Sequence, residues 1–357
     1  MNAQQDGLWP GSRQPDWHPT LSGADVDDIE SLLAAAERAD GSGPISEDVR
    51  LTLRPGLAVG GGHHLLARLP AASVDDLSPP GPLGAVAPAD PDESMIIGYA
   101  HLGGSPASRQ AEAVVHPAHR RQGVGRALVT ALRDACAASS AELDIWAHGD
   151  LPGAAALAGP LGFVRTRVLF QLRRPLGEPL PPPVLPAGIT VRPFEPGRDD
   201  QAWLTVNAAA FADHPEQGRW TADDLARRQQ EPWFDPRGFF VAERDRQLIG
   251  FHWTKVHALD PTPPPDVPPA QVGPVGEVYV VGVLPGSGGA GLGRALTLIG
   301  LHHLRAQGLP TVALYVDEDN DRAVRMYTGL GFTEHARDVS YHWDGQVHPG
   351  GQVHRSG

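Results

Sequence analysis

Residues 278–296, VYVVGVLPGSGGAGLGRAL, read as a strand, a glycine-rich turn and the start of a helix. The apolar run ends at Pro285, small residues fill positions 286–291, and the apolar spacing after Gly291 is helical. A turn of this kind points several backbone N–H groups at one place, and with the helix dipole they bind phosphate oxygens. The stretch therefore predicts a phosphate cradle.

The same pattern occurs earlier in the chain, as AVVHPAHRRQGVGRAL at residues 113–128. When Val115 is set against Val283, the prolines, glycines and following arginine coincide, and each copy continues to an L-G-F segment. A repeat of this length in a chain of 357 residues predicts two similar domains. We expect an α/β fold with an α+β mixed sheet in each copy. The expected parts are a domain at 1–173, a proline-rich linker at 174–187, a domain at 188–343 and a flexible tail at 344–357.

Composition limits the partners and the location. A formal net charge of −13 argues against a nucleic-acid partner, which needs a basic face. No apolar run approaches the roughly 18 residues of a membrane helix, and the N-terminal segment lacks a signal-peptide pattern, so we expect a cytoplasmic protein. Since an intramolecular pair of like domains can satisfy the packing that single domains obtain by dimerising, we expect a monomer. The one cysteine, Cys136, is interpreted as a small core residue, and no ligand spacing indicates a metal site.

Other phosphate motifs fit the glycine turns poorly. A Walker loop would end in G-K-[ST], and a dinucleotide fingerprint would need a third glycine at the first βα turn. VVHPAHRRQGVGRALVTAL instead resembles the acyl-CoA signature of the GCN5-related N-acetyltransferases, the GNAT family. DEDNDRAVRMYTGLGF resembles the second half of that signature, an N-x-x-A-x-x-x-Y-x-x-x-G-F pattern. The alternative is that the glycines only form turns. Two glycine loops, each followed at a similar distance by an L-G-F segment, argue against this alternative.

The resemblance implies two tandem GNAT domains and acetyl-CoA as co-substrate, with a second molecule in the N-terminal domain. In the first copy the implied cofactor-binding residues are Ala113, Val114, Val115, Arg121, Gln122, Gly123, Val124, Gly125 and Arg126. In the second copy they are Val281, Gly282, Val283, Gly288, Gly289, Ala290, Gly291, Leu292, Gly293, Arg294, Asn320, Asp321, Arg322, Ala323, Val324 and Arg325. The second loop lacks the Gln and Arg side chains usual in the family, so its affinity is expected to be lower.

Moving an acetyl group from a thioester to an amine requires a proton acceptor, an oxyanion donor and an acid for the thiolate. In the second copy, Glu277 begins the strand before the turn and suits the base, directly or through water; otherwise it is a solvated strand-end residue. The Val283 N–H suits the thioester carbonyl. Tyr327 suits the acid, unless it is a core aromatic.

The first copy lacks these groups. Arg109 aligns with Glu277 and Ala158 with Tyr327, so that domain is expected to bind acetyl-CoA without catalysing transfer. Glu112 is the nearby carboxylate that could restore a base.

NAAAFADHPEQGRWT, residues 207–221, and VYVVGV resemble the tandem GNAT enzymes that acetylate the cysteinyl amine of Cys-GlcN-Ins (desacetylmycothiol) to give mycothiol. This resemblance implies an acyltransferase acting on an amino-sugar thiol. The acceptor-binding residues it implies are Glu47, Glu216, Lys255, Glu277 and Tyr315. Glu47 could instead be a first-turn helix charge after Ser46, and Lys255 a solvated strand-end residue.

Two other functions stay open. The first is a tandem N-acetyltransferase for another amine, such as an aminoglycoside or a peptide. The second is a non-catalytic acyl-CoA sensor, which the degenerate first copy favours and which the pairing of Glu277 with Tyr327 opposes.

Overall fold

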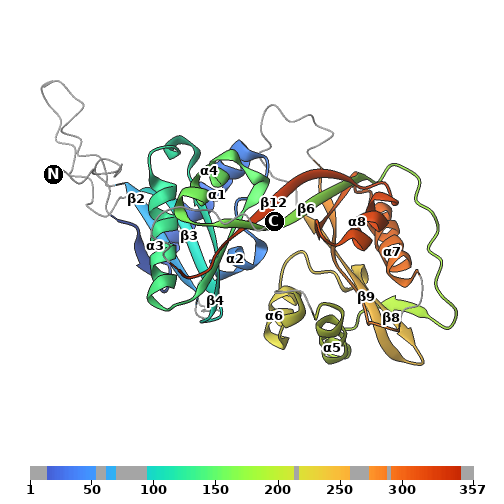
Figure 1. Ribbon diagram of the computed structural model, residues 1–357. Helices are drawn as coiled ribbons and strands as arrows, with labels where there is room; N and C mark the ends of the chain where they lie inside the picture. The colour runs from blue at the N-terminus through green and yellow to red at the C-terminus, as the bar shows by residue number, and fades with distance from the viewer. Residues whose placement is uncertain are drawn as a thin grey trace, which may run out of the picture. The chain divides into compact units, whose positions relative to one another are not determined.

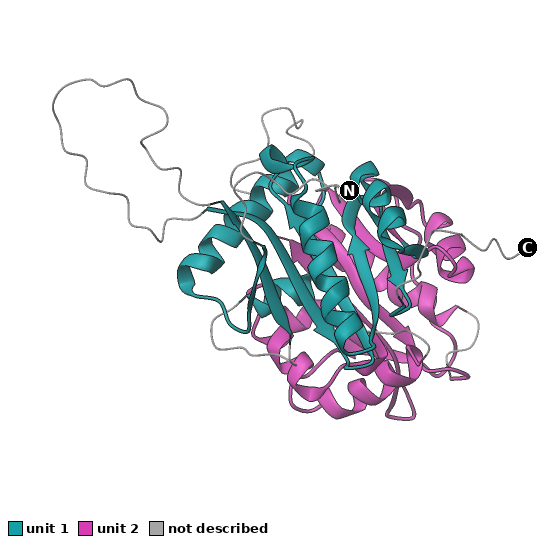
Figure 2. Ribbon diagram, turned by 60° about the vertical axis from the view of Figure 1, so that its left-hand side comes forward, with its two compact units in different colours: residues 1–168, 336–357 teal, residues 169–335 magenta. Residues whose placement is uncertain are grey.

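The computed structural model describes residues 14–53, 62–69, 95–212, 217–257, 273–287 and 291–346. The chain forms two compact units, unit 1 (residues 1–168 and 336–357) and unit 2 (residues 169–335), coloured teal and magenta in Figure 2. Each unit contains a mixed sheet with helices on both faces, which confirms the expected fold class and the duplication. Of the expected tail, residues 347–357 lie outside the described part of the chain.

In unit 1 the strands are ordered β1-β2-β3-β4-β5-β12. They are β1 Asp16–His18, β2 His63–Leu69, β3 Met95–Gly104, β4 Ser108–Val115, β5 Glu142–Ala147 and β12 Thr333–Trp343. Within this order β4 and β5 are parallel and the other pairs antiparallel. The helices are α1 Gly23–Asp40, α2 Glu47–Thr52, α3 Val124–Ala138 and α4 Pro152–Ala158 (Figure 1).

The sheet of unit 1 has apolar side chains on both faces. Because successive strand residues point to opposite faces, Leu65 and Leu66 of β2 enter different cores. Leu65 packs with α3, while Leu66 packs with α1 and α2. Cys136 on α3 is buried in the first of these cores and burial raises the pKa of its thiol, so its interpretation as a core residue is confirmed.

In unit 2 the strands are ordered β6-β11-β10-β9-β8-β7. They are β6 Val164–Pro175, β7 Thr190–Pro193, β8 Phe239–Arg244, β9 Gln247–His257, β10 Val275–Val283 and β11 Thr311–Asp317. The helices are α5 Asp200–Ala210, α6 Ala222–Gln229, α7 Leu292–Ala306 and α8 Asp321–Thr328. Val241 and Ala242 of β8 again face opposite ways, Val241 towards α5 and α6 and Ala242 towards α7.

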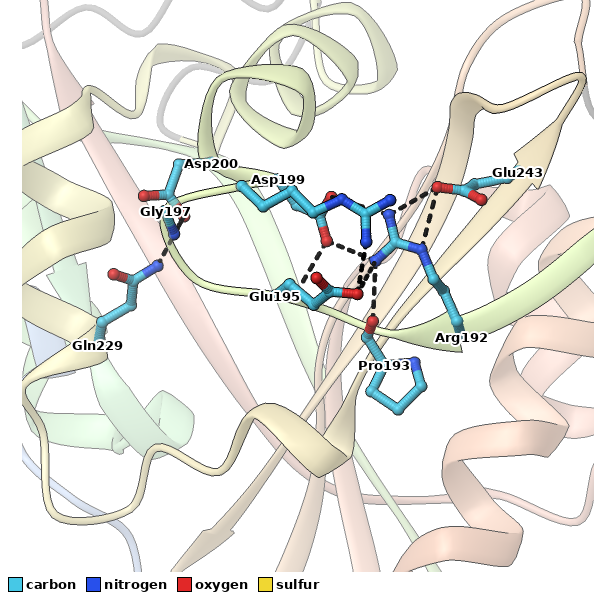
Figure 3. A network of polar contacts seen from close by, with 9 residues as sticks. Arg192, Pro193, Glu195, Gly197, Asp199, Asp200, Gln229 and Glu243 are labelled. Atoms are coloured by element: carbon cyan, nitrogen blue, oxygen red, sulfur yellow. Dashed lines mark hydrogen bonds and ion pairs between the residues drawn. The ribbon is translucent and has the colours of Figure 1, made fainter.

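An ion network anchors β7, the edge strand of unit 2 (Figure 3). The Arg192 guanidinium on β7 donates to both carboxylate oxygens of Asp199 at 2.6 and 2.8 Å, and to Glu243 on β8 at 2.6 Å. Asp199 precedes α5, so the network ties that helix to the strand pair β7–β8. These contacts explain why a four-residue strand is held in place, and we assign them a structural role.

The unit boundaries differ from the expected domain limits because the closing strands are exchanged. Residues 169–175 of β6 pair with β11 in unit 2, and residues 339–343 of β12 pair with β5 in unit 1. Most of the last strand of each sequence copy therefore belongs to the other unit. Strand pairing between residues far apart in the chain leaves no local sequence pattern. The expected domain limits at residues 173 and 188 therefore rested on the repeat alone.

Candidate active site

The parallel strands β10 and β11 separate at Glu277. Their pairing runs from Val275 opposite Thr311 to Glu277 opposite Ala313, although β10 continues to Val283 and β11 to Asp317. On its other edge β10 stays paired with β9 as far as Val283. One edge of the segment after Glu277 thus has no strand partner, and its backbone groups are available to a ligand. The predicted cofactor residues Val281, Gly282 and Val283 lie on this open edge.

Unit 1 contains the same opening. The pairing of β4 with β5 ends at Glu112 opposite Trp146, while β4 continues to Val115. A cavity of about 720 Å³ lies there. Of the predicted cofactor residues of the first copy, Ala113, Val114, Val115, Arg121, Gly123, Gly125 and Arg126 line this cavity. Gln122 and Val124 are not among the lining residues: the Gln122 amide donates to the Ala118 carbonyl at 3.2 Å, and Val124 is buried in the core.

Each glycine turn ends in a glycine that is the N-cap of the following helix. Gly123 (φ 93°) precedes α3 and Gly291 (φ 106°) precedes α7, a left-handed backbone that favours glycine. Neither helix has a side-chain cap, so the N–H groups of its first turn can bind an anion. Leu292, Gly293 and Arg294 form that turn in unit 2, whereas Gly288, Gly289 and Ala290 lie outside the described residues.

The second half of the signature forms α8. Asn320 caps this helix, since its side-chain oxygen accepts from the Ala323 N–H at 3.1 Å. The asparagine of the motif therefore has a local structural role whatever ligand binds. The other predicted cofactor residues of this segment follow it on the helix, namely Asp321, Arg322, Ala323, Val324 and Arg325. Their contact with acetyl-CoA stays a prediction.

Glu277 is not a solvated strand-end residue. Its side chain is only 8% exposed, and its Oε2 lies 2.5 Å from Nε2 of His257, the last residue of β9. The His257 side chain is 46% exposed. Sequence reasoning missed His257. The available signal was its position two residues after Lys255, which puts both on the same face of one strand.

Lys255 is also buried, with 7% of its surface exposed, so the solvated alternative is wrong for this residue as well. It lies opposite Glu277 in the β9–β10 register. Its Nζ lies 4.5 Å from the ring centroid of Trp233 and 5.2 Å from that of Tyr279. Aromatic faces stabilise a cation removed from water, so the two rings hold the ammonium beside the predicted base.

Tyr327 lies on α8, buried, with its ring 5.7 Å from that of Phe332. Burial raises the pKa of Tyr327 to about 12. The phenol is therefore protonated at neutral pH, as an acid for a departing thiolate must be. Its position against coenzyme A stays a prediction.

The other predicted acceptor residues are less constrained. Tyr315 on β11 is 46% exposed, and its hydroxyl accepts from the Gln171 amide at 2.8 Å. Glu47 is the first residue of α2 in unit 1, directly after the Ser46 cap. Glu216 lies outside the described residues. The roles of these three residues at an acceptor stay predictions.

Glu112 in unit 1 occupies the position before strand separation that Glu277 occupies in unit 2, although the sequence alignment put Arg109 there. Its carboxylate accepts from the Ser46 N–H at 2.6 Å and lies 3.3 Å from His148 Nε2. His148 Nδ1 in turn lies 3.1 Å from Asp338 on β12. Burial acts to raise the pKa of Glu112, but the hydrogen bonds from His148 and Ser46 outweigh it and the pKa is lowered. Glu112 is thus ionised, and its carboxylate already interacts with Ser46 and His148, which agrees with the expectation of an inactive first copy.

This buried network predicts a pH-dependent stability. Burial acts to lower the pKa of His148, yet the hydrogen bonds to Asp338 and Glu112 raise it from 6.5 to about 10. Because the folded pKa is the higher one, the stabilisation is complete below pH 6.5, decreases above it and is lost once the pH exceeds about 10. We expect the free energy of unfolding to fall more steeply over this range in the wild type than in His148→Gln.

The matched control for that measurement is Thr166→Val, because the Thr166 hydroxyl also holds β12, by donating to the Ser340 carbonyl at 3.4 Å, but does not titrate. This control should keep the wild-type slope. Equal slopes for the wild type and His148→Gln would show that His148 is not charged in the folded protein.

Two absences concern the described residues alone. Among them, no group of three or more His, Cys, Asp or Glu side chains is placed to hold a metal ion. None of the helices in the same ranges is long and apolar enough to cross a bilayer.

Known proteins share this architecture. Residues 204–332 match the acetyltransferase (GNAT) family, and residues 86–165 match an acetyltransferase (GNAT) domain. A GCN5-related N-acetyltransferase from Sphaerobacter thermophilus superposes with a TM-score of 0.62 at 21% identity, covering 95% of this chain and 98% of that one. A tandem GNAT protein from the clavulanic acid biosynthesis pathway superposes with a TM-score of 0.63 at 18% identity, covering 94% of this chain and 100% of that one. These two structures establish the fold.

The sequence relatives are much nearer. A mycothiol acetyltransferase of Frankia alni is 70% identical over 92% of this chain and 94% of its own length. Those of Frankia casuarinae and Streptomyces coelicolor are 68% and 50% identical, covering 92% and 90% of this chain and 97% and 92% of their own lengths. A match over 90% or more of the chain includes both units. The chain therefore belongs to the GNAT acetyltransferase family and, within it, to the mycothiol acetyltransferases.

Proposed function

We propose that the protein transfers the acetyl group of acetyl-CoA to the cysteinyl amine of Cys-GlcN-Ins, giving mycothiol and coenzyme A. The observation that carries the proposal is the separation of β10 from β11 directly after a buried carboxylate, Glu277. That arrangement offers unpaired backbone N–H groups for a thioester next to a group that accepts a proton. The choice of acceptor rests on the relatives, which are named mycothiol acetyltransferase.

In the reaction, the amine nitrogen attacks the thioester carbonyl, a C–N bond forms and the C–S bond breaks. Glu277 receives the proton that the ammonium loses, directly or through water. The N–H of Val283 on the open edge of β10 stabilises the carbonyl oxygen as it becomes negative. The Tyr327 hydroxyl gives a proton to the departing sulfur. No covalent enzyme intermediate is needed, since holding both substrates in place supplies much of the acceleration.

The acceptor-binding residues are assigned by their chemical match to an amino-sugar thiol. Glu47 and Glu216 match a cationic amine and sugar hydroxyls, and the Lys255 ammonium and Tyr315 hydroxyl can donate to hydroxyls. The test is coenzyme A release with acetyl-CoA and a panel of amines that includes Cys-GlcN-Ins. Turnover with Cys-GlcN-Ins alone supports the proposal, turnover only with aminoglycosides or peptides replaces the acceptor, and binding without turnover favours the sensor.

We further propose a second acetyl-CoA site in the unit 1 cavity, which binds without reacting. A Cβ at Gly125 would meet Leu157 and Val115 at 3.6 Å, an ordinary contact, so Gly125→Ala is tolerated while Gly125→Glu places a carboxylate in the cavity. Calorimetry should count two acetyl-CoA molecules per wild-type or Gly125→Ala chain and one per Gly125→Glu chain, with turnover maintained in all three. Two molecules bound to Gly125→Glu would refute the second site.

A monomeric state and a cytoplasmic location stay predictions of the same proposal. Sedimentation of the purified protein, with and without acetyl-CoA, measures the first.

A further inference from the structure

The exchanged strand β6 extends the face of the sheet on which Glu277 lies. In the register, Glu277 is opposite Ala313 of β11, and Ala313 is opposite Arg173 of β6. Residues that are directly opposite one another in a sheet point to the same face, so these three side chains form one row. On the other edge of β10, Lys255 of β9 is opposite Glu277 and lengthens the row. The predicted base therefore lies between two cationic side chains, Lys255 and Arg173.

Packing on the opposite face confirms the direction of this row. Leu172 and Leu314, the neighbours of Arg173 and Ala313 along their strands, are buried in the core to which α7 contributes. Because successive strand residues alternate between faces, Arg173 and Ala313 point away from α7. Neighbouring strands lie about 4.8 Å apart, so the backbones of Glu277 and Arg173 are about 10 Å apart. Within the row, the methyl group of Ala313 is what separates their side chains.

Arg173 carries a buried N–H group for which the described residues provide no hydrogen-bond acceptor. The atom is Nε of its guanidinium, which is inaccessible to solvent, although the residue as a whole is only partly buried. Burial lowers the pKa of Arg173, and of the described residues it is the Tyr315 phenol that acts in the opposite direction. A guanidinium still stays protonated at neutral pH and keeps five N–H donors. Because a buried donor without an acceptor is costly, the guanidinium is stabilised when a ligand brings an oxygen atom to it.

Gln171 lies two residues before Arg173 on β6 and so points to the same face. It is opposite Tyr315 of β11, and its amide donates to the Tyr315 hydroxyl at 2.8 Å. Tyr315 is 46% exposed and is one of the predicted acceptor-binding residues. β6 thus contributes one residue that holds Tyr315 and a second, Arg173, that lies beside it.

We propose that β6 forms one side of the acceptor site: Arg173 donates hydrogen bonds to sugar hydroxyl oxygens of the acceptor, and Gln171 positions Tyr315. The ammonium of the acceptor is attracted to Glu277 and repelled by the guanidinium, so the hydroxyl-bearing part of the molecule is the part that extends towards β6. Gln171 and Arg173 belong to the first sequence copy but to unit 2 in the structure, so the exchanged strand gives the first copy a part in acceptor binding. The inference deepens the proposed function and rests on it, because it concerns the acceptor of that same reaction.

The decisive variant is Arg173→Gln, which removes the charge but keeps a polar side chain. We expect KM for Cys-GlcN-Ins to rise by about 10- to 100-fold, the range for a lost hydrogen bond from a charged group, while kcat and acetyl-CoA binding stay close to the wild type. GlcN-Ins, which has the sugar hydroxyls but lacks the cysteinyl amine, should inhibit the variant more weakly than the wild type by the same factor. Arg173→Lys keeps a charged donor and should fall between the two. The matched control is Arg305→Gln, an exposed arginine of α7 on the other face of the sheet, which should keep the wild-type KM.

Gln171→Leu tests the positioning role. It should raise KM by about 3- to 10-fold, and this effect should disappear in a Tyr315→Phe background, because Gln171 acts through the Tyr315 hydroxyl. Equal effects of Gln171→Leu in both backgrounds would overturn the positioning role. An unchanged KM in Arg173→Gln, equal inhibition of that variant and the wild type by GlcN-Ins, or a parallel loss of acetyl-CoA affinity would overturn the proposal for Arg173. A wild type that does not acetylate Cys-GlcN-Ins would instead refute the proposed function.

Discussion

Glu277→Gln is expected to lower kcat by about 10²- to 10³-fold, the usual contribution of a positioned acid–base group. The change removes the negative charge but keeps the size of the side chain, so the buried site stays filled. The amide in Glu277→Gln is not basic at neutral pH, so it cannot take the proton that the amine loses. The loss should therefore appear in turnover and not in acetyl-CoA binding.

The measurement is steady-state kinetics with calorimetric binding of acetyl-CoA to the same preparations. Glu178→Gln, an exposed carboxylate in the segment between the two sequence copies, is the charge-matched control and should behave as wild type. A parallel loss of acetyl-CoA affinity and turnover in Glu277→Gln would mean that the carboxylate builds the cofactor site, and the proton-transfer assignment would fall.

Tyr327→Phe is expected to give the second-largest effect, a loss in kcat of about 10²-fold, because the thiolate then leaves without a proton from the protein. Deleting one hydroxyl from a buried ring leaves the packing against Phe332 in place, so stability should change little. Burial raises the pKa of Tyr327 to about 12, hence the phenol stays protonated and the wild type should show no loss of activity from tyrosine ionisation between pH 7 and pH 10.

This result can be separated from a general defect by changing the leaving group. With an acyl donor whose thiol is more acidic than that of coenzyme A, the departing sulfur needs less help, so Tyr327→Phe should approach the wild type. Tyr99→Phe, which removes the hydroxyl of another buried tyrosine, on β3 and away from both proposed sites, serves as the control. An equal deficit with both donors would show that Tyr327 does not protonate the sulfur.

The two units share one architecture but differ in the partners of one histidine. Both place a carboxylate where parallel strands separate, and both give that carboxylate a histidine partner. In unit 2 the histidine is half-exposed. In unit 1 a second carboxylate, Asp338, holds His148 on its other nitrogen, so that ring has no free position to receive a proton. We propose that unit 1 is inactive for two reasons: Glu112 is already bound by His148, and Ala158 stands at the position of Tyr327.

Features that depend on interactions between residues close together in the chain could be predicted from the sequence. Glycines at 123 and 291 were predictable as turn residues because a left-handed cap before an uncapped helix favours glycine. The strand–turn–helix order and the duplication followed from apolar periodicity and the repeat. The predicted roles of Glu277 and Tyr327 came from the same motifs, and both residues are buried where such roles require.

Contacts between residues that are far apart in the chain became apparent only in the tertiary structure. His257 contacts Glu277 across two strands, Asp338 contacts His148 from nearly 200 positions away, and the closing strands are exchanged between the units. Strand register controls all three, and a one-residue shift in register moves every side chain to the opposite face. Register depends on packing summed over a whole sheet, so no short stretch of sequence encodes it. For that reason the glycine turn could be predicted from its own residues, whereas the histidine partner of Glu277 could not.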